Sequence, residues 1–185
     1  MKVLTTSETE ARYRRMFAAH HRAIHTYFRR RIDREVATDC TAETFLIAWR
    51  RIADAPAPEG ELRWLYTIAR NVLRNAYRAK RRSRTVTGID IEPVDRGESP
   101  EAAIERREEA AAVRRAVDRL RSSDREILTM AMWDEIPRED IAAIVGCSPH
   151  AVSQRIHRAA TRLAKELERD PVTRTVGVRR GEATT

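Results

Sequence analysis

The sequence predicts an all-α protein made of two small helical domains. All six glycines and seven prolines fall between segments of helical periodicity, where they interrupt no helix. No segment alternates apolar and polar residues for long enough to indicate a sheet. Charge is also divided along the chain: residues 1–84 hold 19 Lys and Arg against 9 Asp and Glu, whereas residues 85–185 hold 17 against 19. Since 185 residues allow one or two domains, this change indicates a boundary.

Composition favours a polyanionic partner and small cores. The net charge is +8 and the pI about 10.3, and only 5% of the residues are aromatic. Cys40 and Cys147 have no CxxC spacing, so neither a disulfide framework nor a zinc site is predicted. An apolar run of membrane-spanning length and a signal-peptide core are both missing. We therefore expect a soluble cytoplasmic protein without a cofactor.

The first predicted helix runs from about Ser7 to Arg31 and ends in three arginines, which suit the negative end of a helix dipole. His21 and His25 lie one turn apart on it, but no third ligand is near in sequence, so no metal site is predicted. Its expected buried stripe consists of Tyr13, Phe17, Ile24, Tyr27 and Phe28.

The second predicted helix, residues 34–52, carries a polar patch of Asp39, Glu43 and Thr44 beside large apolar side chains. Its periodicity alone favours a helix buried on one face. An acidic patch next to aromatic residues is also typical of a partner surface, so both interpretations stay open. The apolar members are Val36, Cys40, Phe45, Ile47 and Trp49.

A loop at residues 53–60 precedes a predicted helix at residues 61–82 that is strongly basic on one face. Between residues 62 and 84 there are 8 basic residues and no acidic one. Such a face, interleaved with Trp64, Tyr66 or Tyr77 and with asparagines, can grip phosphates and stack bases. A solvated basic face is the alternative, but its self-repulsion favours a nucleic-acid partner. The expected buried stripe is Leu62, Leu65, Ile68, Ala69, Val72, Leu73 and Ala76.

Residues 83–99 replace helix formers with glycine, proline, serine and acidic residues, which predicts a linker. Helices are expected from about Ser99 to Leu120 and again after a cap at Ser123 or Asp124. The last residues, from about 170 onward, are expected to be disordered.

Residues 135–167 predict a helix-turn-helix. Pro137 suits the start of a helix, Gly146 allows the chain to reverse, and Ser148 with Pro149 forms a cap and first turn for a second helix. That helix has an apolar face of Val152, Ile156, Leu163 and Leu167. Its other face is uncharged or basic, so its first turns can donate hydrogen bonds to base edges and phosphates in the major groove. An ordinary helical hairpin with a basic face is the alternative.

Four of the segments described above, taken in their order along the chain, resemble the extracytoplasmic-function (ECF) sigma factors of bacteria. The segments are a DxxxETFxxAW helix, an LRWLYTIARNxxRNxYRxxRR helix, an acidic linker, and DREIL leading into a helix-turn-helix. The resemblance covers about residues 10–167. It implies a transcription initiation factor without catalytic residues, whose sigma domain 2 helical bundle and sigma domain 4 helix-turn-helix are joined by a flexible acidic linker. The corresponding ranges are 7–83 for domain 2, 84–99 for the linker, 100–169 for domain 4 and 170–185 for a disordered tail.

The resemblance also implies functional residues. In that family the helix like residues 39–51 docks on the clamp coiled coil of core RNA polymerase, which implies contacts from Asp39, Glu43, Phe45 and Trp49. The next loop and helix capture the unwound nontemplate strand of the minus-ten element and hold a flipped base. The residues so implied are Pro58, Gly60, Arg70, Asn71, Arg74, Asn75 and Arg78. The second domain reads the minus-thirty-five duplex through His150, Ser153, Gln154, Arg155 and Arg158.

The implied partners are core RNA polymerase, through its beta and beta-prime subunits, promoter DNA and an anti-sigma factor. The loop APAPEG differs from the glycine-rich, aromatic version of relatives, so the identity of the flipped base stays open. One alternative function is a one-component helix-turn-helix regulator, which would bind duplex DNA specifically without polymerase. An enzyme is a third class, but the sequence offers neither a paired acidic metal site nor a nucleophile with a positioned base.

Overall fold

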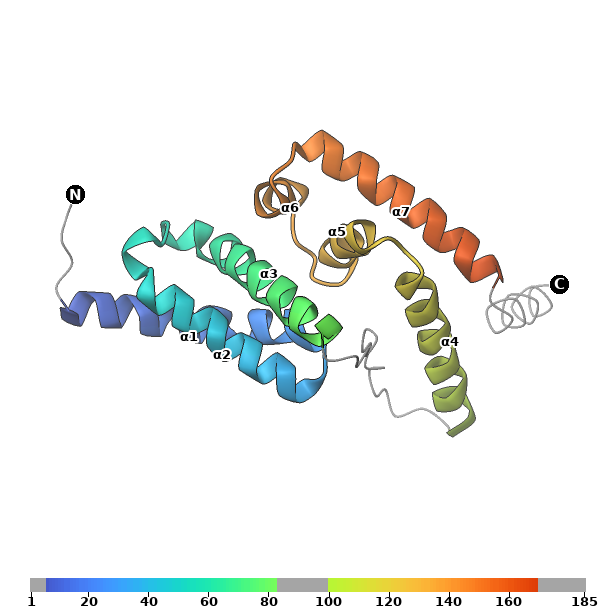
Figure 1. Ribbon diagram of the computed structural model, residues 1–185, viewed down its shortest axis with the longest axis horizontal. Helices are drawn as coiled ribbons and strands as arrows, with labels where there is room; N and C mark the ends of the chain where they lie inside the picture. The colour runs from blue at the N-terminus through green and yellow to red at the C-terminus, as the bar shows by residue number, and fades with distance from the viewer. Residues whose placement is uncertain (1–5, 83–99, 170–185) are drawn as a thin grey trace. The chain divides into compact units, whose positions relative to one another are not determined.

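The computed structural model describes residues 6–82 and 100–169. The predicted linker at residues 84–99 and tail at residues 170–185 lie outside the described residues. Within the described ranges the chain forms seven α-helices and one 3-10 helix, with no strand, which confirms the all-α prediction (Figure 1). The chain divides into two compact units, the first containing α1 to α3 and the second containing α4, α5 and α7.

The first unit is a bundle of three long helices. α1 spans Thr6–Arg29, α2 spans Arg34–Arg50, and α3 spans Pro58–Arg82, with the short 3-10 helix η1 at Ile52–Asp54. Each long helix packs on the other two (Figure 1). Apolar residues at helical spacing on all three helices therefore meet in one core, as the predicted stripes require. The largest fully buried members are Met16, Ile24, Tyr27, Phe28, Phe45, Leu65 and Val72.

A buried arginine closes the turn between α1 and α2. The Arg31 guanidinium donates to the carbonyl oxygen of Tyr27 at 2.7 Å and stacks over the Tyr27 ring at 3.8 Å. These two contacts tie the Arg31 side chain to the last turns of α1. From α3, the Tyr77 hydroxyl donates to the carbonyl oxygen of Arg31 at 3.1 Å. The turn is thus fixed to α3 as well as to α1.

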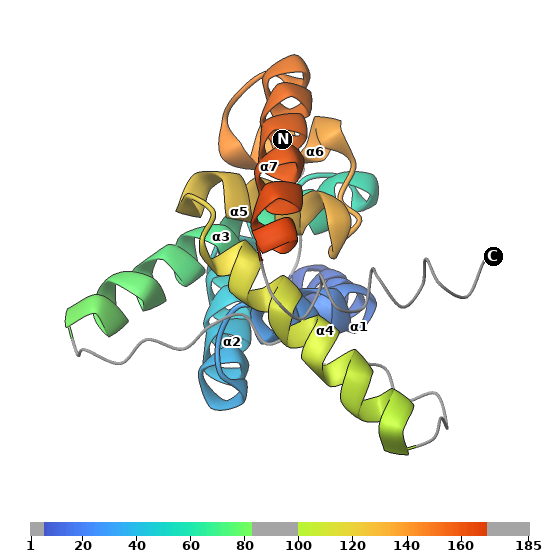
Figure 2. The same cartoon turned by 90° about the vertical axis from the view of Figure 1, so that its right-hand side faces the viewer.

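The second unit is held together by α7. α4 spans Pro100–Asp118, α5 spans Ser122–Met132 and α7 spans Pro149–Arg169, and α7 packs on both of the others (Figure 2). Leu120, Leu128 and Ala159 form a buried cluster against which Ile156 and Leu163 pack. The predicted apolar face of α7 is therefore the face that it buries.

Three expectations need correction. α3 begins at Pro58, so Gly60 lies in its first turn and not in the preceding loop. Phe17 was expected in the buried stripe but is 40% exposed, because it lies at the edge of the α1–α2 contact. Neither Ser123 nor Asp124 caps α5. The N-cap is Arg121, without a side-chain capping bond, and Asp124 instead binds Arg162 of α7.

Candidate functional site

The helix-turn-helix consists of α6, at Arg138–Val145, a three-residue turn and α7. Gly146 has a φ of 75°, the left-handed conformation that glycine adopts at little cost. The Ser148 hydroxyl then accepts a hydrogen bond of 3.2 Å from the backbone N–H of Ala151, which satisfies one of the unpaired donors at the start of α7. The predicted glycine turn and serine cap are both confirmed.

The first turns of α7 present polar side chains to solvent. His150, Ser153, Gln154 and Arg158 are exposed, whereas Arg155 is half-buried. Their internal bonds follow the helix: Ser153 donates to the Pro149 carbonyl oxygen at 3.1 Å, and Gln154 Nε2 lies 2.9 Å from His150 Nε2. Because these bonds are local and exposed, the side chains can exchange them for base edges or phosphates without disturbing the core.

Farther along α7, charged side chains form ion pairs with other parts of the second unit. Arg162 donates to a carboxylate oxygen of Asp124 on α5 at 2.5 Å, and Glu166 lies 3.5 Å from Arg119. The Arg162 side chain is therefore engaged in an ion pair within the second unit. Exposed polar side chains thus continue along the whole of α7, but those near its carboxy-terminal end include members of ion pairs.

The exposed face of α3 carries a continuous polar stripe. Asn71, Arg74, Asn75 and Arg78 follow the i, i+3, i+4, i+7 spacing of one helical face, and all four are exposed. Arg78 donates to the side-chain oxygen of Asn75 at 3.3 Å, and Arg70 is half-buried beside them. The opposite face, with Leu65, Ile68, Ala69, Val72 and Leu73, is buried as predicted.

The aromatic residues of α3 divide between core and surface. Tyr66, which the sequence allowed on the basic face, is buried and its ring lies 5.5 Å from that of Tyr27. Trp64 is half-buried, and Tyr77 is exposed. Tyr66 is therefore unavailable for stacking on a base, because it already belongs to the core of the first unit.

Proline and glycine shape the segment before α3. Pro58 is the first residue of the helix, where its missing N–H removes no helical hydrogen bond. The Gly60 N–H donates to the Ala57 carbonyl oxygen at 2.8 Å, which closes the first turn. A Cβ at Gly60 would lie only 3.1 Å from the Cβ of Pro56, so glycine permits the segment to lie this close to the helix. The segment and the first turn of α3 form one compact unit.

Charged and apolar groups share the outer surface of α2. Asp39 and Glu43 are exposed, and Trp49 is 39% exposed, whereas Phe45 is 2% exposed. Phe45 therefore packs mainly in the core of the first unit. Leu46, which the sequence analysis did not single out, is 46% exposed. Its position seven residues after Asp39 places it on the same helical face, a signal that the sequence did contain.

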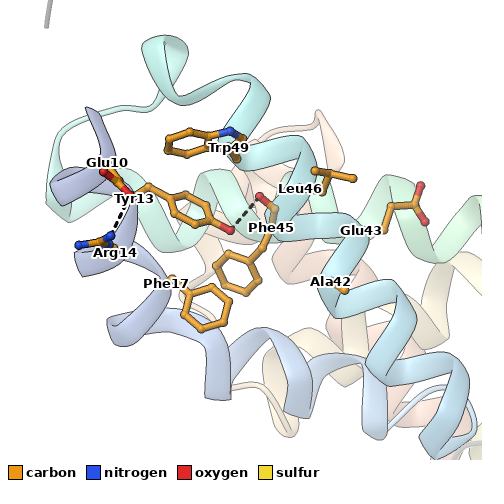
Figure 3. A pocket seen from close by; sticks show the side chains of 9 residues that line it. All are labelled: Glu10, Tyr13, Arg14, Phe17, Ala42, Glu43, Phe45, Leu46 and Trp49. Carbon is orange, nitrogen blue, oxygen red and sulfur yellow. Dashed lines mark hydrogen bonds and ion pairs between the residues drawn. The ribbon is translucent and has the colours of Figure 1, made fainter. Parts of the chain in front are cut away.

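An aromatic groove of about 840 Å³ runs between α1 and α2 (Figure 3). The Tyr13 hydroxyl donates to the Phe45 carbonyl oxygen at 3.3 Å, and burial raises the pKa of Tyr13. The Tyr13 ring meets that of Trp49 edge-on at 5.0 Å, and Phe17 packs on Phe45 at 4.7 Å. The groove is therefore a built aromatic surface with acidic groups at its edge.

Two histidines of α1 stack on one another, and one cysteine of α2 is buried. His21 and His25 stack at 6.0 Å, but the described residues contain no group of three potential metal ligands. Burial, followed by the charges of His21, Arg29 and Arg34, lowers the pKa of His25. Burial, followed by the charges of Glu43 and Asp39, raises the pKa of the Cys40 thiol to about 11. None of the described helices is long and apolar enough to cross a membrane.

Two helical units, a basic polar stripe and a capped helix-turn-helix define a DNA-binding protein of transcription. Comparison of the chain with models of known protein families supports this class. The model of sigma-70 region 2 matches residues 16–83, and the model of sigma-70 region 4 matches residues 110–163. The chain belongs to the ECF sigma factors of the sigma-70 family. It is an alternative sigma factor, which directs RNA polymerase to promoters, and the one-component regulator is not favoured.

Individual relatives support this assignment. The chain is 31% identical over 145 residues to the RNA polymerase sigma-H factor of Pseudomonas aeruginosa, covering 74% of this chain and 75% of that protein. It is 33% identical over 133 residues to the ECF sigma factor EcfG of Rhodopseudomonas palustris, covering 71% of each. Its structure is similar to that of CnrH in complex with the cytosolic domain of CnrY, with a TM-score of 0.64, 25% identity and coverage of 87% and 90%.

Proposed function

We propose that the two units divide promoter recognition between them. Residues 7–83 act as sigma domain 2, which binds core polymerase and captures the minus-ten element. Residues 100–169 act as sigma domain 4, which reads the minus-thirty-five element, and residues 84–99 connect the two. The protein supplies binding energy and no catalytic group, so the polymerase carries out all the chemistry. A protein with these partners works in the cytoplasm, where polymerase and DNA meet.

The polymerase-binding surface in this proposal is the exposed face of α2. Asp39 and Glu43 supply negative charge, and Trp49 and Leu46 supply apolar contact area. A large aromatic in a partly desolvated setting, with charges at its edge, is the usual composition of an energetically important protein contact. Phe45 has a supporting role, because its buried ring holds α2 against Phe17.

The minus-ten single strand is taken by α3. The carrying observation is the exposed stripe of Asn71, Arg74, Asn75 and Arg78, with Arg70 beside it and Pro58 and Gly60 shaping the amino-terminal end of the helix. Arginines neutralise phosphates, and asparagines can bond the edges of unstacked bases. Melting costs a few kcal/mol per unstacked step, and these contacts offset that cost.

The minus-thirty-five duplex is read by α7. His150, Ser153, Gln154 and Arg158 are exposed near the start of the helix, and Arg155 lies among them. In helix-turn-helix proteins the amino-terminal residues of the second helix contact base edges in the major groove. Gln and Arg side chains can make bidentate contacts with adenine and guanine, respectively. We assign sequence readout to these five residues.

The test is transcription from genomic DNA fragments by purified bacterial core polymerase, with mapping of transcript 5′ ends. We expect starts that depend on the protein and share two upstream motifs at fixed spacing. Arg74→Ala combined with Arg78→Ala should impair open-complex formation while leaving core-polymerase binding intact. Equal loss of polymerase binding would contradict the assignment of α3. Specific duplex binding by the protein alone, without new starts, would favour a one-component regulator.

Regulation by an anti-sigma factor is part of the proposal. The structurally similar CnrH has been solved in complex with the cytosolic domain of CnrY, and another relative in complex with the anti-sigma factor NepR. A protein that covers the basic stripe of α3 or the start of α7 would block DNA binding directly. Co-purification of an acidic protein that inhibits transcription in the assay above would support regulation by an anti-sigma factor.

A further inference from the structure

The segment between η1 and α3 is held in place by a side chain from α1. Residues 55–57 follow η1 and lead directly into the first turn of α3. Arg12 reaches this segment from α1, and one of its guanidinium nitrogens donates to the carbonyl oxygens of Ala55 at 2.7 Å and of Pro56 at 2.5 Å. Two consecutive carbonyls of a non-helical segment are thereby fixed by one residue that is more than 40 positions away.

A buried carboxylate orients that arginine. Arg12 Nε lies 3.7 Å from one carboxylate oxygen of Glu61, whose side chain is only 8% exposed. The other carboxylate oxygen of Glu61 lies 3.8 Å from His20 Nε2. Glu61 belongs to the first turn of α3, so the contacts of Arg12 and His20 with its carboxylate join α1 to the beginning of the helix. A carboxylate buried to this extent requires a cationic partner, which gives the pair a defined geometry.

Pro56 is also packed tightly against the helix. The position of a Cβ at Gly60 would be 3.1 Å from the Cβ and 3.2 Å from the Cγ of Pro56. The segment is therefore confined on one side by the helix backbone and on the other by the Arg12 hydrogen bonds. Little freedom is left for residues 55–57 to take another shape.

We propose that Arg12 is a positioning residue for base selection in the minus-ten element. It holds residues 55–57 in the one shape that, together with Pro58 and Gly60, forms the wall against which an unstacked base fits. This inference rests on the proposed function of α3 and extends it to a residue on a different helix. Arg12 itself need not touch DNA, because it acts through the Ala55 and Pro56 carbonyls.

The planar guanidinium is essential to this role. It can bond the two carbonyls and face Glu61 at the same time, because its donors lie in a fixed fork. Lysine keeps the positive charge that Glu61 requires, but it is a point charge on a flexible stem and cannot reproduce that fork. Arg12→Lys therefore separates the shape of the segment from the neutralisation of Glu61.

The test uses holoenzyme reconstituted from core polymerase and the full chain. Nontemplate single-stranded oligonucleotides that span the minus-ten element, with each of the four bases at each position, are titrated against it. The measured quantity is the ratio of dissociation constants between the worst and the best base. For Arg12→Lys we expect this ratio to fall roughly threefold to tenfold at one position, with unchanged affinity for core polymerase.

A matched control is Arg15→Lys, since Arg15 is an exposed arginine on the same helix. This control should keep the wild-type ratio at every position. An Arg12→Lys protein that weakens all oligonucleotides equally, or leaves the ratio unchanged, would overturn the proposal and make Arg12 a structural residue only. A wild-type holoenzyme without base discrimination at any position would overturn it as well.

A second variant removes the charge of Arg12. A third variant distinguishes failure of the role proposed for Arg12 from failure of the function proposed for α3. Arg12→Gln should show the same loss of discrimination with a lower unfolding temperature, and if it does not fold, Arg12→Lys decides alone. Arg74→Ala combined with Arg78→Ala should weaken every oligonucleotide while keeping the base ratio. If this double variant binds like wild type, the proposed function of α3 fails. If it weakens binding while Arg12→Lys keeps the ratio, only the role of Arg12 fails.

Discussion

The guanidinium of Arg162 on α7 lies 2.5 Å from the carboxylate of Asp124 on α5, across 38 residues of sequence. Asp124 is half-buried and Arg162 is exposed. This pair, and not a helix cap, is the structural role of Asp124. It joins the two helices whose contact forms the core of the second unit.

We expect a modest coupling between these two residues. In a double-mutant cycle of Asp124→Asn and Arg162→Gln, the interaction should contribute about 0.5 to 1 kcal/mol, because one partner is exposed to solvent. The coupling should shrink at high ionic strength. Hydrogen exchange of the α7 amides measures it locally, which avoids the assumption that both units unfold together. Strictly additive effects would show that the pair contributes nothing.

Replacement of Gly146 should destabilise the helix-turn-helix through the backbone alone. A Cβ at this position would meet no atom within 4 Å, but the φ of 75° is unfavourable for alanine. Gly146→Ala should therefore cost about 1 to 2 kcal/mol, whereas Gly146→Asn should cost less because asparagine tolerates this conformation. Thermal unfolding of the two variants gives the comparison. An alanine variant as stable as wild type would contradict the left-handed turn.

Arg155 provides a direct test of promoter readout by α7. If it contacts a base, Arg155→Ala should lower affinity for the upstream element by about 1 to 3 kcal/mol and relax the preference at one position. Arg169→Ala is the matched control, because Arg169 lies at the far end of the same helix and pairs with Glu166 at 3.1 Å. Footprinting of holoenzyme on a set of upstream elements measures both. An unchanged preference would remove Arg155 from the reading set.

The salt dependence of single-strand binding should report the arginines of α3. Each phosphate contact releases counterions, so the slope of log affinity against log salt changes by about 0.7 per contact on a single strand. Arg74→Ala and Arg78→Ala should each reduce the slope by about this amount if each touches a phosphate. Asn71→Ala should weaken binding without this change, since it removes no charge. Slopes identical to that of wild type would show that neither arginine contacts a phosphate of the DNA strand.

Alkaline pH should destabilise the protein through Cys40. Its thiol ordinarily ionises near pH 9.0 but has a pKa of about 11 in the folded protein, chiefly because of burial. The folded state therefore binds the proton more tightly, and this contribution to stability is complete below pH 9 and lost as the pH rises through 11. The loss should be about 1.4 kcal/mol per pH unit.

The control for this prediction is Cys40→Ala, which removes the titrating thiol. The free energy of unfolding of wild type should fall more steeply with pH than that of the variant over this range, so the difference between them narrows. Other groups that titrate at alkaline pH contribute equally to both proteins. Parallel pH profiles would show that Cys40 ionises as readily in the folded chain as in the unfolded one.

Features determined by neighbouring residues were predictable from the sequence. Gly146 and Ser148 act within a few residues of their own positions, so turn and cap could be read directly from the residue types. The buried stripe of α3 follows from the helical repeat, because a helix of this length must bury one face to be stable.

Features that depend on distant residues were not predictable. Asp124 has the composition of a helix cap, but Arg162 of another helix takes its carboxylate. Phe17 and Phe45 look equivalent in sequence, yet only the packing of α1 on α2 determines which is exposed. The contact of Arg12 with Ala55 and Pro56 carries no pattern in the sequence at all.

The half-exposed indole of Trp49 makes the aromatic groove observable by fluorescence. Its ring is in edge-on contact with Tyr13 at 5.0 Å and still borders water. Any molecule that covers the groove removes that water, and indole emission moves to shorter wavelength in a less polar environment. Trp64 and Trp133, the other two tryptophans, do not line the groove. The protein therefore carries its own unlabelled optical reporter for occupancy of this surface.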